Sequence, residues 1–166
     1  MGLFGNKNKI DKTNKDLWYC LEVDFKNLTG DEFEKRIASL YRKKGYYVTQ
    51  TPPGKDQGVD LIAKRDNMVI IIQTKNWKGK VTNTDVLKTS GARQMFHANY
   101  AMIITSSYFT KDAKFAIKKS PRIRGMEIDV LKREFKKYFH IEKPKEKTMV
   151  DKIKEQFFGK KSKNTK

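Results

Sequence analysis

The sequence predicts a mixed β-sheet flanked by helices, with elements in the order αβββαβ followed by a C-terminal βα extension. Three observations lead to this fold class: an amphipathic helix near the start, three short apolar strands in succession, and then a regular alternation of helices and strands. A length of 166 residues with 37% hydrophobic residues is sufficient for about one domain with one core.

The first helix is predicted over roughly residues 30–44. Thr29 and Glu32 have the spacing of a capping box, and Gly45 stands where a helix would end. Between them the apolar residues recur at helical spacing: Phe33, Ile37, Leu40 and Tyr41.

The elements after this helix follow from apolar runs and the residues that interrupt them. Strands are predicted at residues 46–49, 59–63 and 68–73, and we expect these three to form a meander. The chain then predicts a helix at 83–97, a strand at 100–105, a helix at 110–119 with Thr110 as its N-cap, a strand at 126–130 and a helix at 132–139.

The charge is strongly basic, because 37 Lys and Arg residues against 19 Asp and Glu residues give a net charge of +18. Such a field attracts polyanions, so nucleic acid is the leading partner and an anionic membrane surface the second. Apolar stretches such as residues 68–72 are far shorter than the roughly 18 residues of a membrane span, so we expect a protein without a membrane segment. A cytoplasmic address, with association to the nucleoid through DNA, is the corresponding expectation. The single cysteine, Cys20, excludes a disulfide within the chain and reads as a small apolar side chain on a short helix.

The domain organisation is predicted as three parts: an N-terminal extension at residues 1–26, a main domain at 27–140, and a basic C-terminal part at 141–166. Residues 111–166 carry 19 of the basic and 8 of the acidic residues. In the last part, a short amphipathic helix precedes a disordered basic tail; its apolar residues are Met149, Val150, Ile153, Phe157 and Phe158.

Candidate chemistry lies where polar residues interrupt buried strands. Asp60 sits inside an apolar strand, and an unpaired carboxylate there is costly enough to require a cation or a metal. At the end of the next strand, the two-residue period places Gln73 and Lys75 on one face and Thr74 on the other. Oxygen ligands such as Asp60 and Gln73 suit Mg²⁺, and Lys75 beside them could hold or deprotonate an attacking water. The alternative is a structural ion pair between Asp60 and Lys75.

An acid in one strand, followed 13 residues later by Gln-x-Lys in the next, resembles the PD-(D/E)xK nuclease superfamily, and most closely its Mrr-type restriction endonuclease family. The resemblance covers roughly residues 28–130. It depends on an ordered set of segments: 28–34, 54–62, 72–81, 91–93 and 103–113.

The resemblance implies a restriction-endonuclease-like core with Mg²⁺ as cofactor, for which Mn²⁺ would substitute. Asp60, Gln73 in place of the usual acid, and the Thr74 carbonyl would be metal ligands, and Lys75 would be the catalytic lysine. Glu34 matches the acid of the first helix in this family, although an ordinary solvated carboxylate pairing along the helix is an equal alternative.

DNA contact is expected next to the Gln-x-Lys motif, because cations and an aromatic side chain there can meet the flanking phosphates. The candidate DNA-binding residues are Asn76, Trp77, Lys78, Lys80 and Arg93. The expected function is a metal-dependent DNA endonuclease that is structure-selective or weakly sequence-specific, or the cleavage subunit of a larger system with a partner protein that supplies recognition. A homodimer is expected for cutting both strands. The alternative is a non-catalytic DNA-binding module that retains the nuclease fold.

Overall fold

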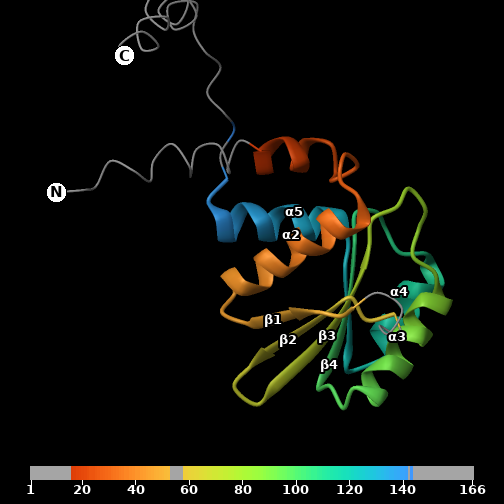
Figure 1. Ribbon diagram of the computed structural model, residues 1–166. Helices are drawn as coiled ribbons and strands as arrows, with labels where there is room; N and C mark the ends of the chain where they lie inside the picture. Colours follow the sequence, from red (N-terminus) through yellow and green to blue (C-terminus); the bar gives the residue numbers. More distant parts are fainter. Residues whose placement is uncertain (1–15, 53–57, 142, 144–166) are drawn as a thin grey trace, which may run out of the picture.

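A five-stranded sheet in the order β1-β2-β3-β4-β5 lies between two layers of helices (Figure 1). The computed structural model describes residues 16–52, 58–141 and 143. The strands are β1 (Tyr47–Gln50), β2 (Leu61–Arg65), β3 (Met68–Lys75), β4 (Tyr100–Thr105) and β5 (Ile123–Met126). The helices are α2 (Gly30–Lys43), α3 (Asn83–Met95), α4 (Lys111–Lys119) and α5 (Ile128–Phe139), preceded by a helical segment at residues 16–22.

The sheet is mixed, as the sequence predicts. β1, β2 and β3 pair in antiparallel fashion, so the predicted meander is confirmed, whereas β3, β4 and β5 pair in parallel. The parallel pairs need crossover helices, and α3 and α4 provide them. Because β3 and β4 are parallel, their carboxyl ends meet at one edge of the sheet, with Lys75 paired to Thr105.

The start and end of α2 agree with the predicted helix. The Thr29 hydroxyl accepts a hydrogen bond from the backbone N–H of Glu32, and the Glu32 carboxylate accepts one from the N–H of Thr29, which completes the capping box. Gly45 follows the helix with a φ of +87°, a conformation that glycine adopts without strain.

The predicted strand at 126–130 is wrong, and the final helix begins earlier than residue 132. Met126, Ile128 and Val130 alternate as in a strand, but Met126 ends β5 and Ile128 opens α5. The apolar residues that decide the matter are Ile128, Leu131 and Phe135, which are buried together at helical spacing, whereas Val130 is exposed.

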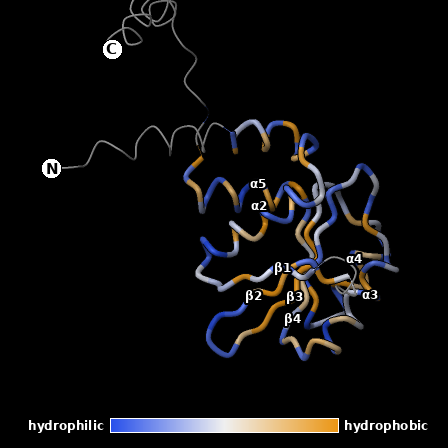
Figure 2. Tube along the Cα trace, viewed as in Figure 1, coloured by the Kyte–Doolittle hydropathy of each residue, from blue (hydrophilic) through white to orange (hydrophobic). Residues whose placement is uncertain are grey.

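The core consists of two clusters of buried side chains, one on each face of the sheet. The first lies between the sheet and α2 with α5, and the second lies between the sheet and α3 with α4. Figure 2 shows the apolar residues concentrated along the strands between these layers. The described part of the predicted N-terminal extension belongs to the first cluster, because its apolar side chains are buried there: Leu17, Cys20, Leu21 and Phe25.

Two sequence expectations concern the periphery of the chain. The predicted C-terminal amphipathic helix and basic tail lie at residues 144–166, outside the described residues. In the part of the chain that the structure describes, no helix combines the length and the apolar character needed to cross a membrane.

Candidate functional site

Asp60 lies directly before β2 and not inside a strand at residues 59–63 as the sequence predicts, and its carboxylate reaches the end of β3. Its Oδ2 accepts two hydrogen bonds from Thr74, one from the backbone N–H at 2.5 Å and one from the hydroxyl at 2.9 Å. Leu61 pairs with Ile72, and the continued antiparallel register places Asp60 opposite Gln73. Two donors on one oxygen fix the orientation of the carboxylate.

Gln73 is held between a helix and a glycine. Its side chain is buried, and its Oε1 lies 2.6 Å from the hydroxyl of Thr89 on α3. On the other side stands Gly58, where a Cβ atom would come within 3.2 Å of Gln73 Nε2. Gly58 also has a φ of +77°, so both its backbone and the closeness of the amide favour glycine. The Gln73 amide is therefore confined to one position.

Lys75 faces the same helix as Gln73, which confirms that the two side chains share one face of the sheet. Its Nζ forms an ion pair with Asp85 Oδ1 at 3.2 Å and lies 4.6 Å from the centre of the Trp77 ring. The side chains of Lys75 and Asp85 are 20% and 14% exposed, so the pair is largely shielded from water. The sequence left open a structural ion pair between Asp60 and Lys75. In the structure, the Lys75 ammonium group pairs with Asp85 instead.

Asp85 also lies in the first turn of α3, where it forms a capping box with Thr82. Its Oδ2 accepts hydrogen bonds from the backbone N–H and the hydroxyl of Thr82, both at 2.9 Å. Burial opposes ionisation of Asp85, but the hydrogen bonds from Thr82 and the charge of Lys75 outweigh it and hold the pKa of this carboxyl below its ordinary value. One carboxylate thus stabilises the helix start and fixes the lysine.

Sequence reasoning missed Asp85 and Thr89. The Thr82-x-x-Asp85 pattern before a helix was a signal for the first, because it has capping-box spacing. Thr89 carries no such signal, since its role depends on the packing of α3 against β3.

Glu34 lies half-buried in α2. Because α2 and α3 belong to core clusters on opposite faces of the sheet, Glu34 would reach Gln73 and Lys75 only around the end of the strands. Its predicted role in the site stays a prediction.

The predicted DNA-binding residues have different surroundings. The Asn76 side chain donates hydrogen bonds to the carbonyls of Leu28 at 2.8 Å and Phe25 at 3.4 Å, so it fastens the end of β3 to the segment before α2. Arg93 donates to the carbonyl of Ala98 at 2.9 Å and closes the end of α3. By contrast, the side chains after Asn76 are exposed: Trp77, Lys78 and Lys80.

A pocket of about 460 Å³ opens between the end of β3 and α3. It contains Gln73 and Lys75 together with residues from one side of the helix. The lining residues are Gly58, Gln73, Lys75, Asp85, Lys88, Thr89, Gly91, Ala92 and Met95. A volume of this size accommodates a ligand about as large as a nucleotide.

The oxygen donors of this region fit a hard cation. Among the described residues there is no group of three or more His, Cys, Asp or Glu side chains that could hold a metal ion. One oriented carboxylate on Asp60, one amide on Gln73 and the Thr74 carbonyl are the donor types that Mg²⁺ accepts, with water completing the coordination.

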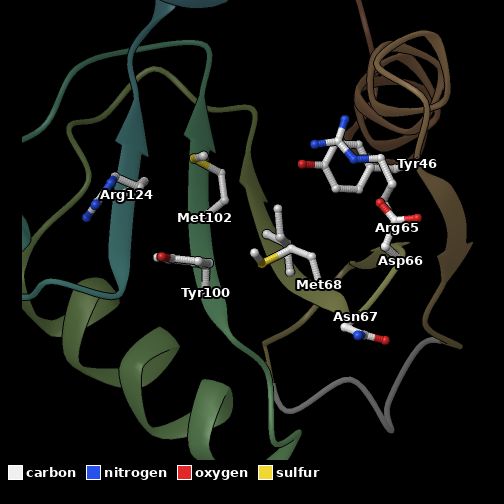
Figure 3. Close-up of a pocket in the computed structure, with 9 residues that line it drawn as sticks. Tyr46, Arg65, Asp66, Asn67, Met68, Tyr100, Met102 and Arg124 are labelled. Carbon is white, nitrogen blue, oxygen red and sulfur yellow. The ribbon is translucent and has the colours of Figure 1, made fainter.

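A second pocket, of about 500 Å³, lies near the opposite ends of β3 and β4 and contains none of these residues. Figure 3 shows Arg65 beside Tyr46 on one side of it and Arg124 beside Tyr100 on the other, with Met68 and Met102 between them.

The mixed five-stranded sheet with helices on both faces is the architecture of a restriction-endonuclease-like fold. A family model described as restriction endonuclease, the Mrr-type catalytic domain, matches residues 25–134. The chain therefore belongs to the Mrr-like restriction endonuclease family, as the Gln-x-Lys pattern predicts.

Solved structures agree on the fold. The DNA modification-dependent restriction endonuclease AspBHI superposes with a TM-score of 0.59 at 14% identity over 72% of this chain. MspJI restriction endonuclease, solved in complex with a 27-mer oligonucleotide, gives a TM-score of 0.54 at 14% identity over 82% of this chain. The superposed regions span only 35% and 33% of those two proteins, so the chain corresponds to about a third of each. No curated protein matches the sequence.

Proposed function

We propose that this chain is a metal-dependent DNA endonuclease that hydrolyses phosphodiester bonds at the pocket between β3 and α3. The observation that carries the proposal is the fixed arrangement at the end of β3. Asp60 is oriented by Thr74, Gln73 is confined by Gly58 and Thr89, and Lys75 is held by Asp85. Gln73 and Lys75 line the pocket, and Asp60 lies opposite Gln73 across the β2–β3 pair. Polar side chains held in this way are typical of a preorganised catalytic site.

Asp60, Gln73 and the Thr74 carbonyl would hold Mg²⁺, or Mn²⁺ in its place. Such a cation supplies positive charge that stabilises the charge developing on the phosphate during hydrolysis. Lys75 would donate hydrogen bonds from Nζ to a phosphate oxygen or to the attacking water. Its ammonium group is suited to this because Asp85 fixes its position at 3.2 Å.

The substrate is proposed to be DNA because the chain combines the family with a net charge of +18. The similarity to MspJI, whose structure contains an oligonucleotide, supports the same substrate class. We further propose weak sequence specificity or selectivity for DNA structure, with recognition supplied by a partner protein where it is needed. Cleavage of both strands would be carried out by two copies of the chain.

The decisive experiment is cleavage of labelled supercoiled, linear, single-stranded, branched and methylated DNA with Mg²⁺ or Mn²⁺. We expect wild type to cut at least one of these and to lose activity in EDTA. Asp60→Asn and Lys75→Ala should abolish cleavage while leaving DNA binding within a few-fold of wild type.

Matched controls are Asp66→Asn and Lys64→Ala, which make the same changes near the β2–β3 turn, at exposed positions away from the pocket. Both should cut like wild type. DNA binding without metal-dependent cleavage of any substrate would contradict the nuclease proposal and favour the non-catalytic DNA-binding module.

A further inference from the structure

One side of α3 faces the candidate pocket, and its composition is unusual for a helix packed against a sheet. Asp85, Lys88, Thr89, Ala92 and Met95 recur at helical spacing along this side, and all of them line the pocket. Asp85 and Thr89 are engaged with the site, as described above. Lys88 and the nearby Gly91 are exposed and belong to neither core cluster of the described residues.

Gly91 stands in the interior of α3, where glycine is less favourable than alanine because it loses more backbone entropy on folding. Its position in the fold does not call for glycine, because a Cβ atom there would meet nothing within 4 Å among the described residues, and its backbone is helical. Gly91 is exposed and borders the pocket. A glycine of this kind is explained by the close approach of something that binds to the protein.

Lys88 lies one turn before Gly91 on the pocket side of α3. Its side chain is exposed, and it forms no ion pair within residues 16–52 and 58–141. Asp85, which lies three residues away, is occupied by Lys75 and Thr82. Among the described residues that line the pocket, Lys88 thus offers an ammonium group without an ion-pair partner, next to helix backbone that carries no side chain at Gly91. That combination suits an anionic chain with a repeating phosphate, and Met95, which is 63% exposed, adds an apolar contact at the far end.

We propose that the DNA strand to be cut crosses α3 at Gly91 and that Lys88 binds a phosphate next to the scissile one. Because Gly91 has no side chain, the sugar-phosphate backbone of the DNA can approach the backbone of α3 there. The DNA strand then continues to Gln73 and Lys75, which line the same pocket. This assignment rests on the proposed nuclease function and names the path of its substrate.

The test measures DNA binding in EDTA, so that it does not depend on cleavage. A fluorescein-labelled duplex and the corresponding single strand are titrated with wild type, Gly91→Ala, Gly91→Leu and Lys88→Ala by fluorescence anisotropy. Lys88→Ala should bind about fivefold more weakly, and the slope of log K against log salt should become shallower by about 0.9, as expected for the loss of one phosphate contact.

The two Gly91 variants separate binding from stability. Because alanine is the better helix former and meets no neighbour, Gly91→Ala should raise the midpoint of thermal unfolding by about 2–4 °C while weakening DNA binding. Gly91→Leu should weaken binding further, since a larger side chain fills the crossing point.

Two control variants introduce alanine at positions outside the pocket. Ser90→Ala alters the adjacent position of α3, which does not line the pocket, and Lys136→Ala removes an exposed lysine from α5, on the other face of the sheet. Both should bind DNA like wild type and keep its salt dependence.

Wild-type binding by Lys88→Ala and Gly91→Leu, in a protein that binds and cuts DNA, would overturn the strand path and leave the nuclease proposal intact. Loss of binding in Lys88→Ala alone, with normal binding by Gly91→Leu, would overturn the crossing at Gly91. Failure of wild type to bind or cut any DNA would overturn both proposals.

Discussion

Replacement of Asp85 by asparagine tests whether one carboxylate stabilises both α3 and Lys75. Asparagine keeps the shape of the side chain and an acceptor oxygen, but it removes the negative charge. The hydrogen bonds from Thr82 at 2.9 Å would be weakened, and Lys75 would lose its partner at 3.2 Å.

The expected decrease in the free energy of unfolding of Asp85→Asn can be estimated from these contacts. A hydrogen bond to a charged group contributes about 1.5–3 kcal/mol, and a helix-start contact contributes about 0.5–2 kcal/mol. Because asparagine retains part of the Thr82 contact and both side chains have some exposure, we expect Asp85→Asn to lower the free energy of unfolding by about 2 kcal/mol near neutral pH.

This loss should depend on pH in a defined direction. The folded-state pKa of Asp85 lies below its ordinary value of 3.8, so its contribution is present above that value and disappears as the pH falls through the lower folded-state pKa. The difference between wild type and Asp85→Asn should therefore shrink in acid.

Urea denaturation of both proteins, at neutral pH and at a pH below the folded-state pKa of Asp85, gives this difference directly, provided that the two slopes agree. Asp112→Asn in α4 is a matched control, because Asp112 is exposed and forms no ion pair among the described residues. A difference near zero at neutral pH, or one of equal size at both pH values, would refute the dual role of Asp85.

Three further substitutions test the surroundings of the site. Thr89→Val should lower the free energy of unfolding by about 1–3 kcal/mol, because it removes the hydroxyl that meets buried Gln73, whereas Thr89→Ser keeps the hydroxyl and should lose less; a loss in Thr89→Val no larger than that in Thr89→Ser, measured by urea denaturation, would contradict a stabilising role of the hydroxyl. Gly58→Ala should lower the free energy of unfolding by about 1–2 kcal/mol because of its left-handed backbone alone, with a lower thermal midpoint, and an unchanged midpoint would contradict the strain expected at this position. Asn76→Ala should lower stability by about 1–2 kcal/mol, measured in the same way, because two carbonyls lose their donor; wild-type stability would argue against the tie to Leu28.

Much of the fold follows from local patterns in the sequence. The capping box of Thr29 and Glu32 and the glycine at position 45 define α2, and β4 occupies the predicted residues 100–105. Such signals work because they depend on neighbours within one turn or one strand. The strand predicted at 126–130 failed because a period-two pattern over three residues competes with a helical pattern that only the burial of Leu131 and Phe135 decides.

In the candidate site, too, local sequence patterns predict some features, and tertiary packing decides the others. The strand period placed Gln73 and Lys75 on one face, and the structure confirms this through their contacts with Thr89 and Asp85. The partners themselves come from α3, whose seating against β3 is set by tertiary packing. Sequence spacing therefore indicates which side chains project together, but not which groups on another element hold them.

The hydrogen bonds of Asn76 also bear on the dynamics of the protein. They connect the end of β3 to the carbonyls of Phe25 and Leu28, and Phe25 belongs to a segment whose apolar side chains are buried in the first core cluster. Local opening of that segment would release Asn76 and with it the end of the strand that carries Lys75. Residues 16–28 and the end of β3 should thus exchange their amide protons as one cooperative unit, so that the integrity of the site depends on residues that precede α2.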